Sequence, residues 1–275
     1  MEKIKLLIPR QPFMVMTTDR YLKKAIYMYG ISHFFQMEIL ENVESIPLYI
    51  PDCCIDLMFY CSKDKKHMGA EIIGSRLKPE SIPIRAGYCY FGVRFMPGFV
   101  PPMITPKMAQ LFGNIIELPE VIYKDFRQSE IFGKDKFEDR INVFLKHYIP
   151  GFNEGRAKEG ADRLVEYIVD KNISTGGTVL LKTLAEETGY SERYINRTFK
   201  ESMGISPKKF ARIIRFQSAI QGFEAGLNPT EIAYQLNYYD CAHMVKEFKE
   251  MCGMRPSELK ALLMESSFYE KLTVL

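Results

Sequence analysis

Hydrophobic and polar positions follow two different patterns along the chain, and the change falls before its middle. Short aromatic and β-branched runs bounded by Pro, Gly and Asp occupy the first hundred residues, most clearly at 55–60 and 88–95. Such runs are typical of strands. From Pro106 the pattern turns helical. It ends in an amphipathic helix whose apolar positions, three or four apart, are Phe137, Ile141, Phe144 and Leu145. The pattern predicts a β-rich first part followed by helices.

A Gly-rich polar stretch, residues 150–156, separates this part from the rest of the chain and is expected to be a linker. Everything after it has the pattern of helices joined by short turns. We therefore expect an α+β protein, with residues 1–150 as a first domain for effector sensing or dimerisation. Residues 156–275 form the second domain, which is expected to be all-α.

The helical part contains an internal repeat. Ala-x3-Gly-Tyr at 185–190 returns as Ala-x3-Asn-Tyr at 233–238, and Phe-Lys-Glu-x2-Gly-x2-Pro at 199–207 returns at 248–256. The two offsets differ by one residue, which places an insertion in the turn between the matched segments. Chance rarely matches so many positions in register, so these are two copies of one unit.

Each copy reads as a helix, a tight turn and a second helix. In the first copy, Gly189 can adopt the left-handed conformation that ends a helix, and Ser191 caps the next one. In the second copy, residues 228–231 (Asn-Pro-Thr-Glu) are a strong helix start. Asn237 stands in the place of the glycine, which Asn tolerates because it also visits left-handed backbone.

The helix after each turn is the one that would enter a major groove of DNA. In the first copy its polar face carries Arg193, Asn196 and Arg197. Arg pairs with guanine and Asn with adenine through two hydrogen bonds. Lys200, one turn further, is expected to meet a phosphate. A polar face alone is usually just solvated, but the duplicated turn favours DNA binding.

The helix between the copies is expected to begin at Ser206-Pro207 and to run to about Gly226. Its length of about 27–30 Å is close to the roughly 34–36 Å between successive major grooves. Its basic residues, which could face phosphates or pair with acids, are Lys208, Lys209, Arg212 and Arg215. The net charge of the chain is only +3, which does not by itself indicate nucleic-acid binding. The local basic cluster indicates DNA binding because it lies beside the repeated helix-turn-helix pattern.

These residues resemble the AraC/XylS family of bacterial transcription regulators. The likeness covers about residues 160–262. It rests on Leu184, Ala185, Gly189, Tyr190, Ser191, Ile195, Arg197, Phe199, Lys200, Gly204, Ser206, Pro207, Arg215, Ala219, Phe248, Lys249, Gly253 and Pro256. It implies two helix-turn-helix units joined by a linker helix, which bind adjacent major grooves of double-stranded DNA.

Matched residue by residue, the base-reading positions of the family fall on Arg193, Asn196 and Arg197 in the first unit. In the second unit they fall near Ala242, His243 and Lys246, and Lys249 completes the expected DNA contacts. Where the family usually has small polar readers and an Arg, this chain has Ala242, Val245 and Lys246. We therefore expect the second unit to contact phosphates rather than to read bases.

The first part resembles a cupin-like sensor domain found in some members of the family, through residues 51–59 and 92–98. This implies effector sensing or dimerisation. Strand alternation places Tyr88, Tyr90 and Arg94 on one face of their strand, and Asp56 on a face of another strand. These four residues are the candidate effector site. Arg94 would anchor an anionic effector or pair with Asp56, and pairing is favoured because buried charges are normally paired.

The sequence offers no support for catalysis, a metal or a cofactor, and we expect none. The six cysteines form no C-x-x-C pair and the four histidines are scattered, whereas zinc sites and disulfide frameworks need closer, regular spacing. A cysteine-dependent DNA-repair enzyme would need a four-cysteine zinc site, and a cupin enzyme a cluster of His and carboxylate ligands. We expect reduced, mostly buried thiols.

The expected partners follow from these assignments. They are double-stranded DNA, a second copy of the chain, a small-molecule effector and, as a further candidate, RNA polymerase. No apolar run approaches the roughly 18–20 residues of a membrane helix and no secretory signal is evident, so a cytoplasmic location without membrane contact is expected. One alternative stays open: a regulator whose first half only dimerises and binds no ligand. The stripe at Phe137 and Ile141 is either the dimer surface or part of its own domain's core.

Overall fold

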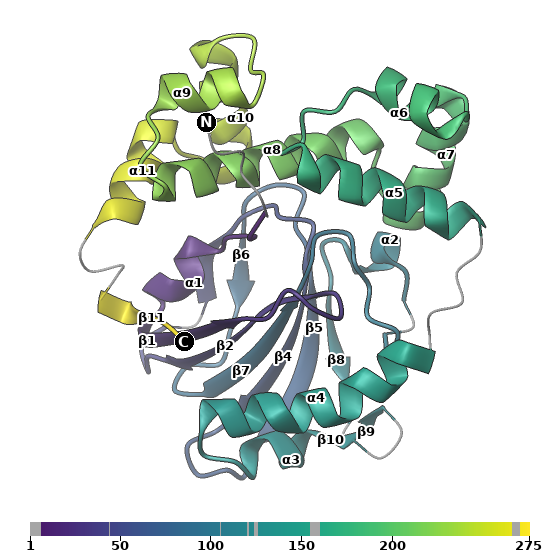
Figure 1. The fold of residues 1–275 in the computed structure, drawn as a ribbon. Helices are drawn as coiled ribbons and strands as arrows, with labels where there is room; N and C mark the ends of the chain where they lie inside the picture. Colours follow the sequence, from purple (N-terminus) through teal and green to yellow (C-terminus); the bar gives the residue numbers. More distant parts are fainter. Residues whose placement is uncertain are drawn as a thin grey trace.

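The structure is a computed structural model that describes residues 7–43, 45–104, 106–119, 121–123, 126–154, 160–265 and 270–275. A β-rich part lies below a helical part, and the helices of the second part span the top of the sheet (Figure 1). This arrangement confirms the α+β architecture expected from the sequence.

A seven-stranded sheet forms the centre of the first part, in the order β11-β1-β2-β7-β4-β5-β8. Its strands are β1 (Thr18–Ala25), β2 (Ile31–Ile39), β4 (Ile55–Cys61), β5 (Met68–Gly74), β7 (Cys89–Phe95), β8 (Ile115–Leu118) and β11 (Leu272–Val274). Two small sheets accompany it: β3 (Ser45–Tyr49) with β6 (Glu80–Pro83), and β9 (Val121–Tyr123) with β10 (Phe126–Arg127). Strands β4 and β7 confirm the runs predicted at 55–60 and 88–95.

One face of the sheet packs against two helices, α3 (Gln128–Phe132) and α4 (Phe137–Glu154). Phe144 of α4 is fully buried there, with ring centroids 5.6 Å from Phe34 and 6.3 Å from Phe59. Phe137 and Ile141 are also buried. The apolar stripe of α4 is therefore core of its own domain, and the alternative that made it a dimer surface is wrong.

Helix α4 does not stop where the sequence predicts a linker. It continues through Pro150 to Glu154, with Pro150 inside the helix. Proline removes one backbone hydrogen bond, but Phe152 in the last turn packs against Tyr148 and Tyr29, at 5.9 and 5.5 Å between ring centroids. Because these contacts stabilise the turn, the linker prediction is wrong over 150–154, while residues 155 and 156 lie outside the described ranges.

The second part consists of helices joined by short turns. They are α5 (Gly160–Ser174), α6 (Leu181–Thr188), α7 (Glu192–Met203), α8 (Pro207–Glu224), α9 (Pro229–Gln235), α10 (Cys241–Cys252) and α11 (Pro256–Met264). Helix α8 runs between two lobes, with α6 and α7 at one end and α9 and α10 at the other (Figure 1). It begins at Pro207, with Ser206 as its cap, as the sequence predicts.

The chain returns to the first domain after α11, which the sequence does not predict. Strand β11 joins the edge of the large sheet parallel to β1, with Tyr21 opposite Leu272 and Lys23 opposite Val274. The backbone N–H of Leu275 donates to the carbonyl of Lys23 at 2.8 Å. The expectation that residues 156–275 are all helical is therefore wrong at residues 272–274. The edge of β1 offers backbone N–H and C=O groups that another strand can bind, and β11 pairs with it.

The six cysteines are free thiols; four are buried, Cys89 is half-buried and Cys241 is exposed. This confirms the expected mostly buried thiols. Among the helices within the described ranges, none combines the length and the apolar character that a membrane crossing requires.

Candidate functional site

The first helix-turn-helix unit has the turn that its sequence predicts. Gly189 ends α6 in the left-handed conformation, with φ of +73°. Ser191 then caps α7, and its hydroxyl oxygen accepts a hydrogen bond from the backbone N–H of Tyr194 at 3.2 Å. The glycine and the cap together set the angle at which α7 leaves the turn.

The second unit repeats this geometry with different residues. Asn228 caps α9 by accepting hydrogen bonds from the backbone N–H groups of Thr230 and Glu231, both at 3.0 Å. Asn237 takes the left-handed conformation, with φ of +52°, in place of the glycine. Asp240 then caps α10 by accepting from the backbone N–H of His243 at 2.6 Å. The sequence predicts the first two features, and the capping role of Asp240 comes from the structure.

Helix α7 presents its predicted DNA contacts on one side. Arg193, Arg197 and Lys200 are exposed, while Ile195 and Phe199 on the opposite side are buried in the core. Asn196 is half-buried, and its amide donates to the carbonyl of Glu192 at 3.0 Å. This bond engages one of the two amide hydrogens of Asn196, whereas the guanidinium of Arg197 lies 5.5 Å from the ring centroid of Tyr194.

Helix α10 is arranged in the same way. Its predicted contacts, Ala242, His243, Lys246 and Lys249, are all exposed. Its opposite side, with Met244, Phe248 and Met251, is buried. The structure thus brings the eight predicted DNA-binding residues onto the outer sides of two helices at opposite ends of α8.

Two arginines of the connecting helix pair with an acid instead of facing outward. Glu247 of α10 is 1 % exposed and accepts hydrogen bonds from Arg215 (2.8 Å) and Arg212 (3.0 Å) of α8. The hydroxyl of Tyr238 donates to the same carboxylate at 2.8 Å. We refer to Arg212, Arg215, Tyr238 and Glu247 as the arginine clamp. The sequence gives no signal for Glu247, because a glutamate in an amphipathic helix normally faces solvent.

The clamp explains the charge state of its carboxylate. Burial alone would raise the pKa of Glu247, but the hydrogen bonds and charge of Arg215 and Arg212 outweigh it and hold the pKa below the ordinary value. Glu247 is therefore ionised at neutral pH, and it ties α10 to α8.

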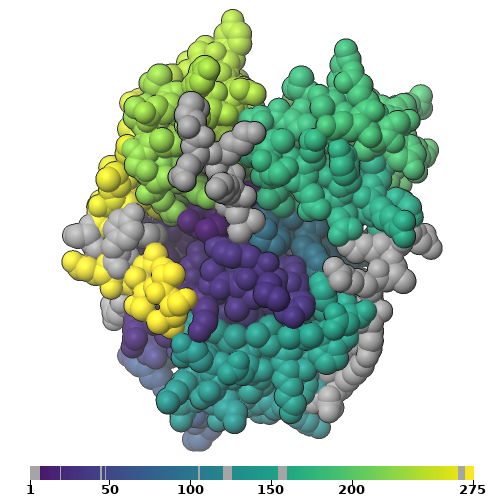
Figure 2. Space-filling view, viewed as in Figure 1, coloured from purple at the N-terminus to yellow at the C-terminus, as the bar shows by residue number. Residues whose placement is uncertain are grey.

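A cleft of about 990 Å³ separates the two lobes, and the space-filling view shows it as a notch at the top of the molecule (Figure 2). Its walls come from α5, α6, α8 and α10. Lys208 and Lys246 contribute positive charge, and Thr178 and His243 contribute polar groups. The lining also holds acids that pair with bases of the same cleft: Glu187 with Lys171, Glu250 with Arg212, and Glu247 with the arginine clamp. This composition suits a strand of phosphates passing between the lobes.

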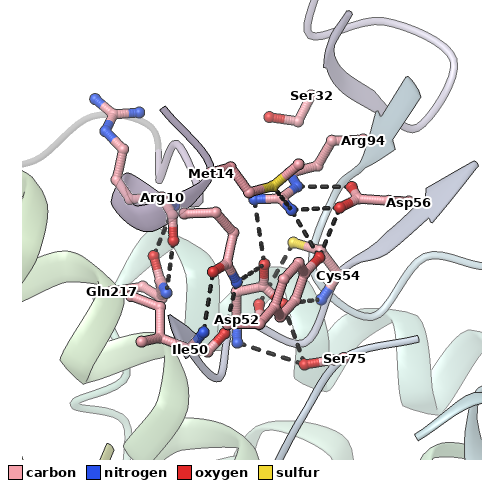
Figure 3. A network of polar contacts seen from close by, with 12 residues as sticks. Arg10, Met14, Ser32, Ile50, Asp52, Cys54, Asp56, Ser75, Arg94 and Gln217 are labelled. Carbon is pink, nitrogen blue, oxygen red and sulfur yellow. Dashed lines mark hydrogen bonds and ion pairs between the residues drawn. The ribbon is translucent and has the colours of Figure 1, made fainter. Parts of the chain in front are cut away.

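In the first domain, Arg94 lies in a buried polar network (Figure 3). Its Nε is 2.7 Å from Asp56 Oδ1, its Nη2 donates to the hydroxyl of Tyr49 at 2.7 Å, and its Nη1 is 3.4 Å from Asp52. The pairing of Arg94 with Asp56, favoured by the sequence, is confirmed. Tyr90 and Tyr88 lie further along the same face, where Tyr90 accepts a hydrogen bond from the backbone of Arg85.

The polar network reaches the helical part through a glutamine. Gln217 of α8 is fully buried; its side-chain oxygen accepts from the backbone N–H of Arg10 at 2.8 Å, and its amide donates to the carbonyl of Pro51 at 2.8 Å (Figure 3). A second contact joins α2 (Met108–Leu111) to the end of α7. A Cβ at Gly204 would lie 2.8 Å from the Cα of Ala109, so only glycine permits this approach. The two halves of the chain thus share an interface.

A cavity of about 300 Å³ lies beside the network, between β1, the segment before α1 (Pro12–Met16), α8 and β11. Of the four predicted effector residues, Arg94 alone is among its lining residues within the described ranges. Its other ionisable side chains include Arg10, Lys23, His33 and Glu224, none of which the sequence singles out. They come from four separate segments, so sequence proximity gave no signal.

Two family models match the chain. Residues 184–261 match a helix-turn-helix domain, and residues 24–117 match a domain of unknown function, DUF6597. A curated relative, an uncharacterized HTH-type transcriptional regulator, YbfI of Bacillus subtilis, is 35% identical over 66 residues. That match spans 24% of each chain.

The chain also has a partial likeness to solved structures. The C-terminal domain of AraT, a response regulator from Geobacillus stearothermophilus, is 25% identical with a TM-score of 0.35, over 40% of this chain and 91% of that one. ToxT from Vibrio cholerae is 12% identical with a TM-score of 0.46, over 84% of this chain and 99% of that one. On the evidence of the family models and the two capped turns, the chain carries an AraC-type helix-turn-helix domain at residues 184–261, behind an N-terminal domain of the DUF6597 family.

Proposed function

We propose that this protein is a DNA-binding transcription regulator without catalytic activity, whose helices α7 and α10 enter adjacent major grooves of double-stranded DNA. The observation that carries the proposal is the repetition of one turn geometry at both ends of α8, each followed by a helix with an exposed polar or basic side. A helix of 18 residues is about 27 Å long, which suits two successive grooves on one face of the duplex.

The two recognition helices are proposed to work differently. Arg193, Asn196 and Arg197 of α7 offer paired hydrogen bonds to base edges, and Lys200 offers a charge to a phosphate. On α10, Ala242 cannot donate or accept a side-chain hydrogen bond, while His243, Lys246 and Lys249 can meet phosphates. Helix α7 would therefore read sequence, and α10 would mainly add affinity and register.

The arginine clamp is proposed to hold the two helices in register with the DNA. Because Glu247 lies on α10 and both arginines lie on α8, the clamp fixes the orientation of the second unit on the connecting helix. Arg212 and Arg215 are then occupied in positioning, and Lys208 is the residue of α8 best placed to meet phosphate in the cleft.

Fluorescence anisotropy with the full chain and labelled duplex DNA tests this function. We expect salt-dependent binding, with the logarithm of the association constant falling linearly with the logarithm of salt concentration, because phosphate contacts release counterions. Selection of bound genomic fragments should then yield a common sequence. A folded chain that shows no salt-dependent binding to any fragment would refute the proposal.

We also propose that residues 1–150 sense a small-molecule effector for a DNA-binding domain at 156–275. The cavity and its direct contact with α8 support this, since an occupant would touch both halves. The residues first expected to bind the effector are less suited to it: Arg94 and Asp56 neutralise each other, and Tyr88 and Tyr90 lie outside the cavity lining.

A second candidate role for the first half is dimerisation without a ligand. A symmetric dimer would pair two DNA modules on two half-sites, although α4 does not supply its surface. Sedimentation of the full chain at tens of micromolar, with and without duplex DNA, tests assembly. Contact with RNA polymerase is a further proposal that follows from regulation, and pull-down of purified polymerase on promoter DNA would test it.

A further inference from the structure

Two stacked tyrosines lie beside the exposed arginines of α7. The rings of Tyr190 and Tyr194 have centroids 4.9 Å apart and an interplanar angle of 19°. Tyr190 follows Gly189 in the turn, and Tyr194 lies in the first turn of α7. The cap fixes the backbone of Tyr194, because the Ser191 hydroxyl accepts a hydrogen bond from its N–H. The turn therefore sets the place of both rings, which we call the tyrosine pair.

The guanidinium of Arg197 contacts the tyrosine pair. Its Cζ lies 5.5 Å from the ring centroid of Tyr194, within the distance of about 6 Å at which an aromatic face attracts a cation. The two residues are three apart, so they lie on the same side of the helix. Within the described ranges, no carboxylate forms an ion pair with Arg197. A ring attracts the charge without occupying the N–H groups as a carboxylate would, so these groups stay free to bind a base.

The second unit arranges the corresponding residues differently. The repeat aligns three positions: Tyr238 with Tyr190, His243 with Tyr194, and Lys246 with Arg197. Tyr238 is buried and faces the arginine clamp, where its hydroxyl donates to Glu247 at 2.8 Å and Arg215 lies 4.5 Å from its ring centroid. The ring of His243 meets Tyr238 edge-on, at 5.5 Å between centroids and an angle of 72°. In the second unit, an edge-on contact thus replaces the stacked pair and a lysine replaces the arginine.

We infer that Tyr194 is a positioning residue for base reading: its ring, stacked on Tyr190, holds the guanidinium of Arg197 in the orientation that meets a guanine. The inference rests on the proposed function, because it concerns the helix to which base reading is assigned. Phosphate contacts are open to any DNA sequence, whereas a guanine must meet two N–H groups in one fixed geometry. Holding Arg197 in that geometry therefore sharpens the preference for one base pair.

The gain comes from conformational entropy. An arginine side chain in solvent samples many rotamers and loses this freedom when it binds a base. When a neighbouring ring already holds the side chain, part of that freedom is lost before binding, so binding costs less. The ring need not touch DNA for this effect, and Tyr194 then acts through Arg197 alone. Its contribution should disappear when Arg197 is removed.

Competition anisotropy with the full chain tests the inference, using the selected duplex and a duplex changed at the base pair whose preference Arg197→Ala loses. We expect Tyr194→Leu to reduce the ratio of the two affinities about two- to fivefold, the effect of an exposed cation–π contact. Tyr194→Phe should keep the wild-type ratio, because it keeps the ring. In the Arg197→Ala chain, Tyr194→Leu should leave the ratio unchanged.

Tyr234→Leu is the matched control, because Tyr234 is an exposed tyrosine on α9 of the other unit, and this variant should keep the wild-type ratio. Equal weakening of both duplexes by Tyr194→Leu would show that the ring supports only the fold. That result, a wild-type ratio in Tyr194→Leu, equal losses in the Phe and Leu variants, or the same loss in the Arg197→Ala chain would overturn the inference.

NMR of the arginine Nε–H groups tests the contact in the wild-type chain without DNA. The Nε–H proton of Arg197 should be shifted upfield by the ring current of Tyr194, relative to that of the exposed Arg193 on the same helix. The shift should persist in Tyr194→Phe and vanish in Tyr194→Leu. Equal shifts for the two arginines in the wild type would overturn the inference whether or not Tyr194→Leu folds.

The failure of this inference is distinguishable from that of the proposed function. A chain that binds no DNA refutes the proposed function. A chain in which Arg197 reads a base pair without help from Tyr194 refutes this inference alone. If Arg197→Ala loses affinity but no preference, both this inference and the assignment of α7 as the reading helix are overturned, while DNA binding itself stands.

Discussion

Glu247 on α10 and Arg215 on α8 form a buried ion pair, 2.8 Å from Oε2 to Nη2, between the second recognition helix and the connecting helix. Arg212 and Tyr238 bond to the same carboxylate. These hydrogen bonds occupy most of the lone pairs on the two carboxylate oxygens of Glu247. A buried charge is tolerated when it is paired and hydrogen-bonded in this way. The carboxylate of Glu247 therefore binds two basic residues, Arg212 and Arg215, that a charge count alone would assign to DNA.

Removing this carboxylate should destabilise the second unit strongly. We expect Glu247→Ala to lower the free energy of unfolding by about 3–5 kcal/mol, because two arginines lose their buried partner. The exposed Glu250, which pairs with Arg212 at 2.6 Å, is the matched control, and Glu250→Ala should cost about 0–1 kcal/mol. Urea unfolding at pH 7 measures both, and equal losses would contradict the buried role of Glu247.

Because the folded-state pKa of Glu247 lies below its ordinary value, the stability that Glu247 contributes should be present above about pH 4.5 and fade as the pH falls through the folded-state pKa.

The two recognition helices should lose different properties on mutation. Arg197→Ala is expected to cost roughly 1–3 kcal/mol of binding to the selected sequence and to relax preference at one or two base pairs, as loss of a paired base contact does. Lys246→Ala should weaken binding to all sequences about equally. Anisotropy against the selected site and a scrambled duplex separates these outcomes. A larger loss of specificity for Lys246→Ala would reverse the assignment of the reading helix.

The stripe of α4 should behave as core. Phe144→Ala is expected to destabilise the first domain by about 3–5 kcal/mol, because a fully buried ring leaves a cavity. Lys146→Ala, at an exposed position of the same helix, should change stability by less than about 0.5 kcal/mol. Thermal unfolding and sedimentation test this prediction. A Phe144→Ala chain that is fully stable but no longer self-associates would show that α4 forms a dimer surface.

The interface between the halves should depend on Gln217. Gln217→Ala leaves the half-buried N–H of Arg10 and the buried carbonyl of Pro51 without this partner, at a cost of about 1–3 kcal/mol. We expect faster proteolytic cleavage near residue 10 in this variant. Lys208→Ala, an exposed substitution on the same helix, should leave cleavage unchanged while weakening DNA binding. Equal cleavage rates in wild type and Gln217→Ala would show that this glutamine does not hold the halves together.

The ligand-free chain should be stabilised by removing the charge of Lys23. Desolvation, followed by the positive charge of Arg10, lowers the pKa of Lys23 from its ordinary value of 10.5 to about 7 in the folded chain. The unfolded chain therefore holds the proton more tightly between these pH values. Stability therefore rises with pH across that window, and the full penalty applies below pH 7. Lys23→Met should unfold at a higher temperature than the wild type at pH 6, and the difference should shrink toward pH 10. Lys24→Met is the control, because the neighbouring Lys24 pairs with Glu138 of α4 at 3.6 Å. If the difference in unfolding temperature between Lys23→Met and the wild type stays constant with pH, the lowered pKa of Lys23 is contradicted.

The sequence by itself determined the elements whose signals are local. Gly189, Ser191, Asn228 and Asn237 act through their own backbone or within three residues of it, so the two turns and their repetition could be predicted. Strands β4 and β7 and helix α8 follow for the same reason, and the exposure of the α7 and α10 contact residues follows from helical periodicity.

Only the tertiary structure decided the features that join distant segments. From the sequence, the apolar stripe of α4 could be either a dimer surface or part of its own domain's core. The sheet decided this by placing Phe34 against Phe144. The same holds for Arg215, whose partner lies 32 residues away, and for Lys23, whose cavity needs the segment before α1, α8 and the C-terminal strand. Sequence periodicity says which side of an element is apolar, but the burial and pairing of a charge depend on which other element covers it, and that is a property of the whole fold.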